Sequence, residues 1–326
     1  MISDSFGRRV SYLRLSVTQA CSMRCLYCRP ASHKPAARAA SSPDLTRSEI
    51  KRLVAHLVRT HGLRKVRLTG GEPCARPDIE DILADLHALP ALQTLVMTTN
   101  GLTLRSRAQA YHDAGLQRVN VSLDSLDPER FDRITGCDGL PLVLDGIDAA
   151  LAAGLAPLKI NTVVVRGEND DQLHDLLTFA AVRGIEIRFI ELMPMGPLAD
   201  QWTRRFVPAS EMRWRLRDTV AHWSDLPQTS DAARRCVAHL HSGRTAAVGF
   251  ITAMSCPFCA SCDRLRIASD GGFYPCLMDR PAGSLLDAIR PVFNPREIDR
   301  RLDLGYVQRA REHPARGVAT MVSIGG

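Results

Sequence analysis

The sequence predicts an α/β fold: an incomplete (β/α)6 barrel of the TIM type, with a C-terminal extension that closes the barrel. Three observations support this prediction. Six short β-branched segments recur along the chain, helical stretches separate them, and polar clusters directly follow several of them. Strand–helix alternation indicates a parallel sheet, and barrel active sites gather at the C-terminal ends of the strands. The chain has 326 residues, 45% of them hydrophobic, which is enough for such a core.

The six expected strands are recognised by their apolar, β-branched composition. They occupy residues 13–18, 65–69, 94–99, 118–123, 158–165 and 186–192. The first helix is expected to begin after Thr46, because Thr46-Arg-Ser-Glu49 has the pattern of a capping box. The later helices are expected around residues 78–88, 103–114, 141–153 and 170–183.

Two regions depart from this alternation. Residues 31–45 are small and show no periodicity, so we expect a mobile loop there. After residue 197 the pattern breaks down: residues 224–245 are polar and irregular, and a charged helical stretch follows the last cysteines. We therefore divide the chain into a partial barrel, residues 1–200, and a C-terminal region, residues 201–326, which carries a second cysteine group and a Gly-Gly tail.

Three cysteines follow the first expected strand with the spacing C-x3-C-x2-C: Cys21, Cys25 and Cys28. Three thiolates can bind three irons of a [4Fe-4S] cluster and leave the fourth iron open, whereas a closed structural site needs four protein ligands. The motif therefore indicates chemistry at a cluster. The alternatives are three unrelated thiols, or a zinc site that a distant ligand completes.

A second cysteine group lies in the C-terminal region: Cys256, Cys259, Cys262 and Cys276. Its spacing allows two interpretations. The last three cysteines alone would leave one position of a cluster open, whereas all four would close the site, as in a zinc knuckle.

The chain is basic, with a formal net charge of +7, and only four of its cations are lysines. The arginines are spread without blocks, and guanidinium groups match phosphate oxygens well. Cations on the expected strands include Arg14, Lys65, Arg67, Lys159 and Arg188. Charge on a barrel strand is costly unless a carboxylate pairs with it or an anionic ligand binds it. The strands therefore indicate either internal ion pairs or a polyanionic substrate.

Ten cysteines, an N-terminus without an apolar signal core, and the lack of any apolar run near ~18 residues predict a cytoplasmic protein with reduced thiols. The turn Gly70-Gly71-Glu72-Pro73 follows a strand, and its glycines would let the backbone approach a ligand closely. The chain has no P-loop and no Rossmann glycine motif, so neither holds a nucleotide here.

Together these features resemble the GTP 3′,8-cyclase family of molybdenum cofactor biosynthesis, in the radical S-adenosylmethionine (SAM) superfamily. The resemblance runs nearly end to end. It is carried by the first cysteine motif with Tyr27, and by the stretches Lys65-Val-Arg-Leu-Thr-Gly-Gly-Glu-Pro, Thr98-Thr-Asn-Gly, Val119-Asn-Val-Ser-Leu-Asp-Ser, Lys159-Ile-Asn-Thr-Val-Val, Arg188-Phe-Ile-Glu, Cys262-x-Arg-Leu-Arg and the terminal Gly-Gly.

The resemblance implies a lyase, GTP 3′,8-cyclase, with SAM and two [4Fe-4S] clusters as cofactors. It implies conversion of GTP to (8S)-3′,8-cyclo-7,8-dihydroguanosine 5′-triphosphate, the first step of molybdopterin synthesis. Reductive cleavage of SAM would give a 5′-deoxyadenosyl radical that takes the 3′ hydrogen of GTP. No side chain is then expected to act as a catalytic acid or base.

The resemblance also implies a role for individual residues. The cluster ligands would be Cys21, Cys25 and Cys28 for the first cluster, and Cys259, Cys262 and Cys276 for the second. Cys256 would be an extra cysteine that binds no cluster. SAM would contact Tyr27, Gly71, Glu72, Ser122 and Met193. GTP would contact Arg14, Arg67, Thr98, Lys159, Arg188, Arg264, Leu265 and Arg266, and the tail residues Gly325 and Gly326 would reach the active site.

The same resemblance implies certain partners: an external electron donor, and a downstream cyclic pyranopterin monophosphate synthase that receives the product. It allows a homodimer, and it implies no nucleic acid and no membrane. Two alternatives remain at this point. One is a radical SAM enzyme that acts on another substrate, such as a peptide, and the other is a zinc protein that binds nucleic acid.

Four residues depart from the family pattern: Arg29, Cys74, Asp263 and Cys256. Arg29 stands where methionine is usual after the third cysteine, and Asp263 replaces an asparagine before Arg264. Because both change the charge beside a cysteine group, they affect the expected cluster potential and turnover more than the reaction type.

Overall fold

The computed structural model describes residues 1–29 and 44–317. Most of the loop expected at 31–45, and the tail residues Gly325 and Gly326, lie outside this part of the chain. The six expected strands are confirmed, and they form a parallel sheet in chain order. They are β1 (Tyr12–Ser16), β2 (Lys65–Thr69), β3 (Thr94–Thr99), β4 (Arg118–Ser122), β5 (Lys159–Val164) and β6 (Glu186–Glu191).

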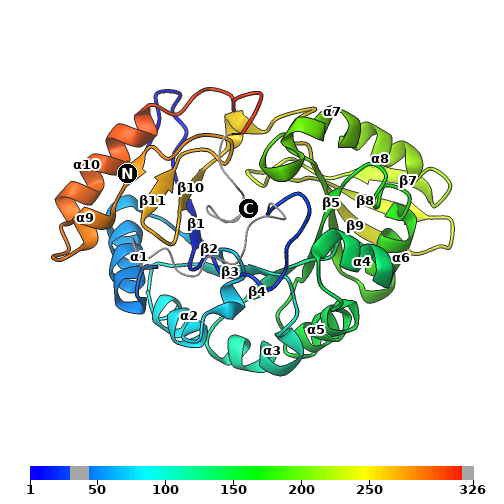
Figure 1. Ribbon diagram of the computed structural model, residues 1–326, viewed down its shortest axis with the longest axis horizontal. Helices are drawn as coiled ribbons and strands as arrows, with labels where there is room; N and C mark the ends of the chain where they lie inside the picture. Colours follow the sequence, from blue (N-terminus) through cyan, green and yellow to red (C-terminus); the bar gives the residue numbers. More distant parts are fainter. Residues whose placement is uncertain (30–43, 318–326) are drawn as a thin grey trace.

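Helices cover the outer side of the curved sheet, as in a TIM-type barrel (Figure 1). They are α1 (Arg47–His61), α2 (Ile79–His87), α3 (Leu104–Asp113), α4 (Pro128–Thr135), α5 (Leu140–Ala152) and α6 (Leu173–Arg183). The predicted capping box is confirmed: the Glu49 amide donates to the Thr46 hydroxyl over 3.3 Å, and the Thr46 amide donates to the Glu49 carboxylate over 2.8 Å. Helix α4 was not predicted.

The irregularity predicted for residues 224–245 is wrong, because strands occupy this region. They are β7 (Val220–Asp225), β8 (Arg234–Leu240) and β9 (Thr245–Ile251). Strand β9 pairs in parallel with β6, and β8 and β7 follow it in antiparallel fashion. Along β8, half-buried and exposed residues alternate with Cys236, Ala238 and Leu240, which are buried. An antiparallel strand with one solvent-exposed face has a partly polar composition, so the sequence of this region did not indicate strands.

The C-terminal region also lengthens the opposite edge of the sheet. Strand β10 (Arg264–Ile267) pairs in parallel with β1, and β11 (Gly272–Tyr274) and β12 (Gly283–Ser284) follow it. The result is one 12-stranded sheet in the order β12-β11-β10-β1-β2-β3-β4-β5-β6-β9-β8-β7. The expectation that the extension closes the barrel is therefore corrected: among the described residues, the two outermost strands do not pair, and the sheet stays open.

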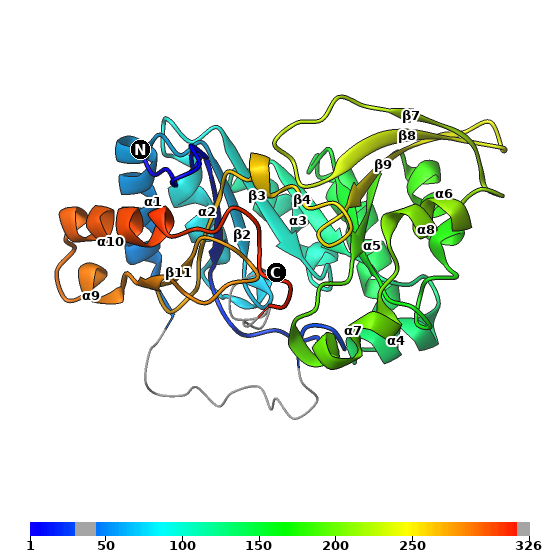
Figure 2. The ribbon, with the colours of Figure 1, turned by 90° about the horizontal axis from the view of Figure 1, so that it is seen from above.

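Short elements complete the chain, most of them in its C-terminal region, and Figure 2 shows the strands β7 to β9 and the helices α9 and α10 at opposite ends of the molecule. These elements are the 3₁₀ turns η1 (Pro73–Ala75), η2 (Gly196–Gln201) and η3 (Cys259–Ser261), and the helices α7 (Trp202–Arg205), α8 (Ala209–Arg215), α9 (Leu286–Ile289) and α10 (Pro295–Val307). The charged helical stretch expected after the last cysteines corresponds to α10. Of the helices in residues 1–29 and 44–317, none is long and apolar enough to cross a membrane.

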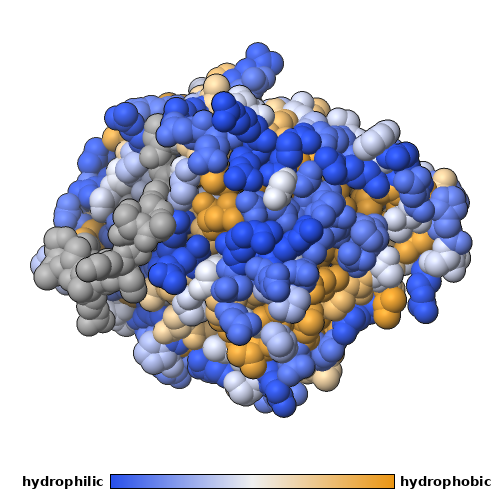
Figure 3. Space-filling model, turned by 45° about the vertical axis from the view of Figure 1, so that its right-hand side comes forward, coloured by the Kyte–Doolittle hydropathy of each residue, from blue (hydrophilic) through white to orange (hydrophobic). Residues whose placement is uncertain are grey.

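The main apolar core lies between the sheet and its covering helices. Leu13 and Leu15 of β1 are fully buried in it, while the residues that alternate with them, Tyr12 and Arg14, point to the inner face. On the side of the molecule shown in Figure 3, hydrophilic side chains predominate and hydrophobic ones form smaller groups between them. Because Tyr12 and Arg14 alternate with Leu13 and Leu15, the inner face of β1 is polar while its outer face is packed in the core.

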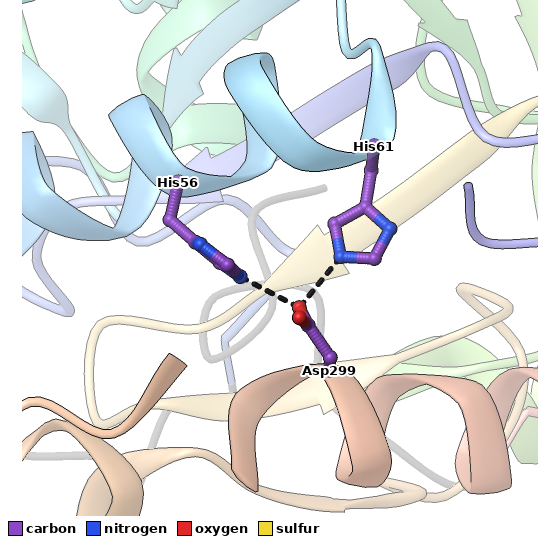
Figure 4. A group of neighbouring side chains, drawn as sticks. All are labelled: His56, His61 and Asp299. Atoms are coloured by element: carbon purple, nitrogen blue, oxygen red, sulfur yellow. Dashed lines mark hydrogen bonds and ion pairs between the residues drawn. The ribbon is translucent and has the colours of Figure 1, made fainter. Parts of the chain in front are cut away.

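One polar cluster joins α1 to the C-terminal helix α10 (Figure 4). The Nε2 atoms of His56 and His61 lie 2.6 and 2.7 Å from one carboxylate oxygen of Asp299. These are hydrogen-bond lengths, and they are shorter than the roughly 3.3 Å that separates ligand atoms around a tetrahedral zinc with bonds near 2.0 Å. The three side chains therefore form a hydrogen-bonded clamp between two helices.

Candidate functional site

Two rows of polar side chains cross the inner face where β10, β1 and β2 lie side by side. The strand register places Arg264, Tyr12 and Lys65 in one row, and Arg266, Arg14 and Arg67 in the next. Side chains two positions apart on a strand share a face, so both rows point inward. Leu265 lies between the two arginines of β10 and is fully buried in the core. Only its main chain is therefore available to a ligand on the inner face.

Tyr12 and Arg67 link the two rows. The Arg67 Nε donates to the Tyr12 hydroxyl over 2.5 Å, and its Nη1 donates to the Thr98 hydroxyl over 2.9 Å. Burial acts to raise the pKa of Tyr12, but the charges of Arg67, Arg14 and Lys65 outweigh it and lower the pKa to about 7. This face of the sheet therefore has a strong positive potential.

The crowding of cations also lowers their own pKa values. Burial, together with the charges of Arg67 and Arg264, lowers the pKa of Arg14 to about 10. Burial and the charges of Arg14 and Arg264 lower the pKa of Arg266 well below its usual value. An added negative charge would therefore stabilise the charged form of each of these cations, and the arrangement suits a polyanionic ligand.

Lys159 and Arg188 extend the positive surface to β5 and β6, where carboxylates meet it. Glu186 accepts from Lys159 Nζ over 2.8 Å and from Arg188 Nε over 2.6 Å. Asp231, from the segment between β7 and β8, accepts from Arg188 Nη2 over 2.5 Å. Carboxylate pairing, which the sequence left open, thus occurs here, while the described contacts of Arg67 are with Tyr12, Thr98 and a backbone carbonyl.

The first cysteine group lies on the loop that leaves the C-terminal end of β1. The Cys28 amide donates to the Cys25 carbonyl over 2.9 Å, so the loop turns tightly between these two ligands. Burial raises the pKa of the Cys28 thiol to about 12, with the Cys21 thiol adding to the shift. Burial and the charge of Asp124 raise the pKa of Cys25, and Cys28 and Cys21 add to that shift. The three thiols are thus close enough to act on one another, and a bound cation would favour their ionised forms.

The Gly70-Gly71 turn packs against this loop. The Gly71 amide donates to the Thr18 carbonyl over 2.7 Å, and a Cβ on Gly71 would lie 2.3 Å from the Ala20 carbonyl oxygen. No side chain fits in that space, which explains the glycine in this motif. The turn therefore holds the cysteine loop in place.

Glu72 follows these glycines and joins the ends of β2 and β3. Its carboxylate accepts from the Thr99 hydroxyl over 2.7 Å and from the backbone amides of Cys74 and Asn100 over 3.0 and 2.6 Å. The side chain is 4% exposed. These contacts give Glu72 a positioning role in the protein, and its contact with SAM stays a prediction.

Tyr27 is buried beside the first cysteine group and donates to Asp124 at the end of β4 over 2.6 Å. The second oxygen of Asp124 accepts from the Val163 amide over 2.8 Å. Ser122 lies half-buried two residues before Asp124, and Met193 packs against the apolar cluster that contains Tyr27. The structure thus brings the predicted SAM contacts of β4 and β6 to the same end of the sheet as the first cysteines.

The second cysteine group lies at the start of β10 and after β11. Cys259 and Cys276 line one pocket with Arg8 and Arg309, and Arg309 donates to the Cys262 carbonyl over 2.8 Å. Although burial acts to raise the pKa of the Cys262 thiol, Arg264 and Arg309 lower it overall. Cys256 instead is exposed, and its Sγ lies 2.7 Å from Arg234 Nη2.

The other departures from the family pattern have clear local contacts. Arg29 is buried and donates to the Gln19 carbonyl, and its charge acts to lower the pKa values of the Cys21 and Cys28 thiols. Asp263 accepts from the Ser11 hydroxyl over 2.5 Å, at the start of β1. Cys74 is buried with its Sγ 3.6 Å from the Thr99 hydroxyl. Of the three, Arg29 is therefore the one that changes the charge around a cysteine group.

Four carboxylates with clear roles in this site were not predicted as site residues: Asp124, Glu186, Glu191 and Asp231. Glu191 accepts from the Met254 and Ser255 amides over 2.9 Å, and so anchors the segment before the second cysteine group. Asp124 and Glu191 stand in the polar clusters that end their strands, so their positions carried a usable signal. Asp231 comes from a loop, and nothing in its local sequence marked it.

Comparison with known protein families agrees with this arrangement. A family model described as the radical SAM superfamily matches residues 15–180, and one described as Molybdenum Cofactor Synthesis C matches residues 185–314. One similar protein is a GTP 3′,8-cyclase of Aeromonas hydrophila, 39% identical over 96% of this chain and 91% of its own. Another is GTP 3′,8-cyclase 1 of Pseudomonas aeruginosa, 43% identical over 84% of this chain and 82% of its own.

More distant matches extend the comparison. The chain is 37% identical to human molybdenum cofactor biosynthesis protein 1, and the aligned part covers 96% of this chain and 48% of that protein. Among solved structures, Streptococcus suis SuiB bound to S-adenosylmethionine aligns with a TM-score of 0.62 at 16% identity, over 88% of this chain and 67% of that one. This last likeness supports the fold, an open radical SAM barrel. The chain therefore belongs to the radical SAM superfamily and, within it, to the GTP 3′,8-cyclase family.

Proposed function

We infer that this chain is a radical SAM GTP cyclase that acts in molybdenum cofactor biosynthesis. The observation that carries this inference is the polar inner face of the sheet, which lies between two cysteine groups and has more cations than carboxylates. A triphosphate matches such a face because several arginines and lysines converge on it. The family relationship favours this substrate over the peptide and over the nucleic acid that the sequence had left as alternatives.

The two cysteine groups fit one open cluster each. We propose that Cys21, Cys25 and Cys28 hold the first cluster, on the loop that the Gly71 turn supports, and that Cys259, Cys262 and Cys276 hold the second. When bound, the first cluster supplies the electron that cleaves SAM reductively and so starts radical chemistry. The protein contributes half-buried thiols, the loops that carry them and flanking cations.

The cations divide into two groups along the inner face. We propose that the phosphates bind to Arg67, Lys159, Arg188 and the hydroxyl of Thr98. These residues come from β2, β5, β6 and β3, and they surround one part of the inner face. Arg14, Arg264 and Arg266 would bind the ribose and base side, since the charge of Arg266 acts on the Cys276 thiol. The contact of Gly325 and Gly326 with the substrate also stays a proposal.

SAM is proposed to lie at the C-terminal end of the strands. Tyr27, Gly71, Glu72, Ser122 and Met193 would contact it there, beside the first cysteine loop. The Tyr27–Asp124 hydrogen bond is buried at this end of the sheet, and burial strengthens electrostatic contacts.

Several features of the biological setting follow from the proposed reaction. An external donor must supply the electron, and a downstream cyclic pyranopterin monophosphate synthase would take up the cyclised nucleotide. We propose that the protein is cytoplasmic and that it forms a homodimer. We also propose a domain boundary near residue 200, between the barrel and the C-terminal region. The experiment for the activity is anaerobic incubation with SAM, reductant and GTP. A cyclised nucleotide is expected. Cleavage of SAM in the presence of GTP without formation of this nucleotide would contradict the inference.

A further inference from the structure

The loop between β7 and β8, residues 226–233, reaches the inner face of the sheet. Its Asp231 accepts from both terminal nitrogens of Arg188, over 3.2 Å from Nη1 and 2.5 Å from Nη2. The Arg188 side chain is 6% exposed, while the Asp231 side chain is 31% exposed. A loop carboxylate therefore occupies the position beside Arg188 that an anionic group of a ligand would take.

Asp231 also faces the neighbouring cations of this surface. Burial acts to raise its pKa, but the charges of Arg188, Lys159 and Lys65 outweigh burial and lower the pKa far below its usual value. Asp231 is thus ionised, and its charge acts on Arg188 and Lys159, which we assign to the phosphates, and on Lys65. A phosphate group brought to the same place would repel it.

The other carboxylate at this place, Glu186, is held differently. It stands on β6, which pairs with β5 on one side and β9 on the other, and its side chain is 6% exposed. Glu186 binds Lys159 and Arg188 at once. A ligand cannot remove it without disturbing the middle of the sheet, so Glu186 is the permanent partner of these cations.

Asp231 has weaker attachments. Its amide donates to the Thr229 hydroxyl over 3.2 Å, and its carbonyl accepts from Gln228 over 3.3 Å, and both partners lie within the same loop. The loop also contacts β10, across the inner face, where the Ser230 carbonyl accepts from Arg264 Nη2 over 3.3 Å. Movement of this loop would therefore release the terminal nitrogens of Arg188 from Asp231, and Arg264 Nη2 from the Ser230 carbonyl.

We propose that Asp231 is a displaceable counter-ion: it occupies the anion position beside Arg188 when no nucleotide is bound, and the phosphates of the substrate displace it toward solvent. The proposal rests on the proposed function of this face. It makes Asp231 a residue that sets the selectivity of the site, because only a ligand with enough negative charge at Arg188 exchanges with the carboxylate. A nucleoside without phosphates leaves the loop in place.

The test uses inorganic tripolyphosphate as a probe of the phosphate positions, with guanosine for comparison. Asp231→Asn removes the charge and keeps the size of the side chain. Asp225→Asn is the matched control, because Asp225 belongs to the adjacent β7 and its exposed side chain lies 3.6 Å from Arg213. In calorimetry at constant salt, Asp231→Asn should bind tripolyphosphate roughly three- to tenfold more tightly than the wild type, as expected for losing a competing, partly exposed ion pair. Asp225→Asn should match the wild type, and guanosine binding should not change.

A second measurement detects the movement itself in the unmodified protein. Backbone hydrogen exchange in residues 226–233 should become faster when tripolyphosphate is added, because the loop loses its contacts with Arg188 and Arg264. Weaker tripolyphosphate binding by Asp231→Asn, or slower exchange in the loop, would overturn the proposal and make Asp231 a fixed part of the ligand site. Neither measurement depends on turnover, so a failure of the cyclase activity would be recognised separately.

Discussion

The hydroxyl of Tyr27 donates a 2.6 Å hydrogen bond to the buried carboxylate of Asp124. This contact ties the first cysteine loop to the C-terminal end of β4, across 97 residues of sequence. Burial raises the pKa of Asp124 to about 6, above the usual value near 3.8. The link between the loop and the sheet therefore depends on a carboxylate that titrates close to neutral pH.

Asp124 should make the pH dependence of stability measurable. Its pKa is higher in the folded state, so its contribution to folding is full below about pH 4 and is lost as the pH rises through about 6. Asp124→Asn removes this titration. The free energy of unfolding of the variant, relative to the wild type, should increase by about 2–3 kcal/mol between pH 4 and pH 7. Denaturant unfolding at a series of pH values tests this, and a difference that stays constant across the window would refute it.

The cations of the inner face should affect one ligand only. Arg67→Ala and Lys159→Ala should weaken GTP binding about ten- to a hundredfold, because each removes a charge-assisted contact worth roughly 1.5–3 kcal/mol. SAM affinity should stay close to that of the wild type. Arg105→Ala and Lys51→Ala are matched controls, since both side chains form exposed ion pairs on helices. Equal loss of GTP and SAM binding would instead indicate general damage to the barrel.

The two candidate ligand sets predict different iron contents. Cys276→Ala should lose the iron of one cluster after anaerobic reconstitution, and Cys25→Ala should lose the iron of the other together with SAM cleavage. Cys256→Ser should keep the iron content of the wild type, because Cys256 is exposed beside Arg234 while Cys259 and Cys276 line a common pocket. Loss of one cluster in Cys256→Ser would show that the second site is closed by four thiols.

Arg29 should tune the first cluster. Its buried charge lies close enough to Cys21 and Cys28 to favour their ionised forms. A nearby cation also stabilises the more negative, reduced state of a cluster, so Arg29→Met should make the midpoint potential more negative. A redox titration followed by electron paramagnetic resonance would measure the shift. An unchanged or more positive potential would show that the charge of Arg29 is screened.

The clamp of His56, His61 and Asp299 should fasten the C-terminal helix. Asp299→Ala leaves two buried imidazole groups without their acceptor, which costs roughly 1–3 kcal/mol of stability for each unsatisfied group. Asp303→Ala, an exposed change on the same helix, is the control. Denaturant unfolding compares the two variants, and equal stability would mean that water replaces the lost acceptor without cost.

The sequence predicted the parts of the fold that local pattern determines. The bounds of β2 and β3 agree with the prediction, because a short β-branched run is bounded by clear turn residues. The capping box of α1 is a local contact between Thr46 and Glu49, so it could also be predicted from the sequence. Helix α4 begins at Pro128 with Asp127 as its N-cap, so the local sequence does carry a signal for this helix.

The remainder depended on contacts between distant segments. The pairing of β9 with β6 and of β10 with β1 makes one sheet from both regions of the chain, and no local pattern specifies those partners. The ion pair of Asp231 with Arg188 joins a polar loop to a strand 43 residues earlier. The cysteines and strand cations were predictable because their residue types are costly without a ligand or partner, whereas a loop carboxylate is ordinary until the fold places it.

The most direct test of the account is the fate of one hydrogen atom. Anaerobic reaction of the reconstituted enzyme with SAM, a reductant and GTP carrying deuterium at C3′ should transfer one deuterium to 5′-deoxyadenosine and yield a cyclised nucleotide. Mass spectrometry of both products measures this. Unlabelled 5′-deoxyadenosine, formed while GTP is recovered unchanged, would contradict the account.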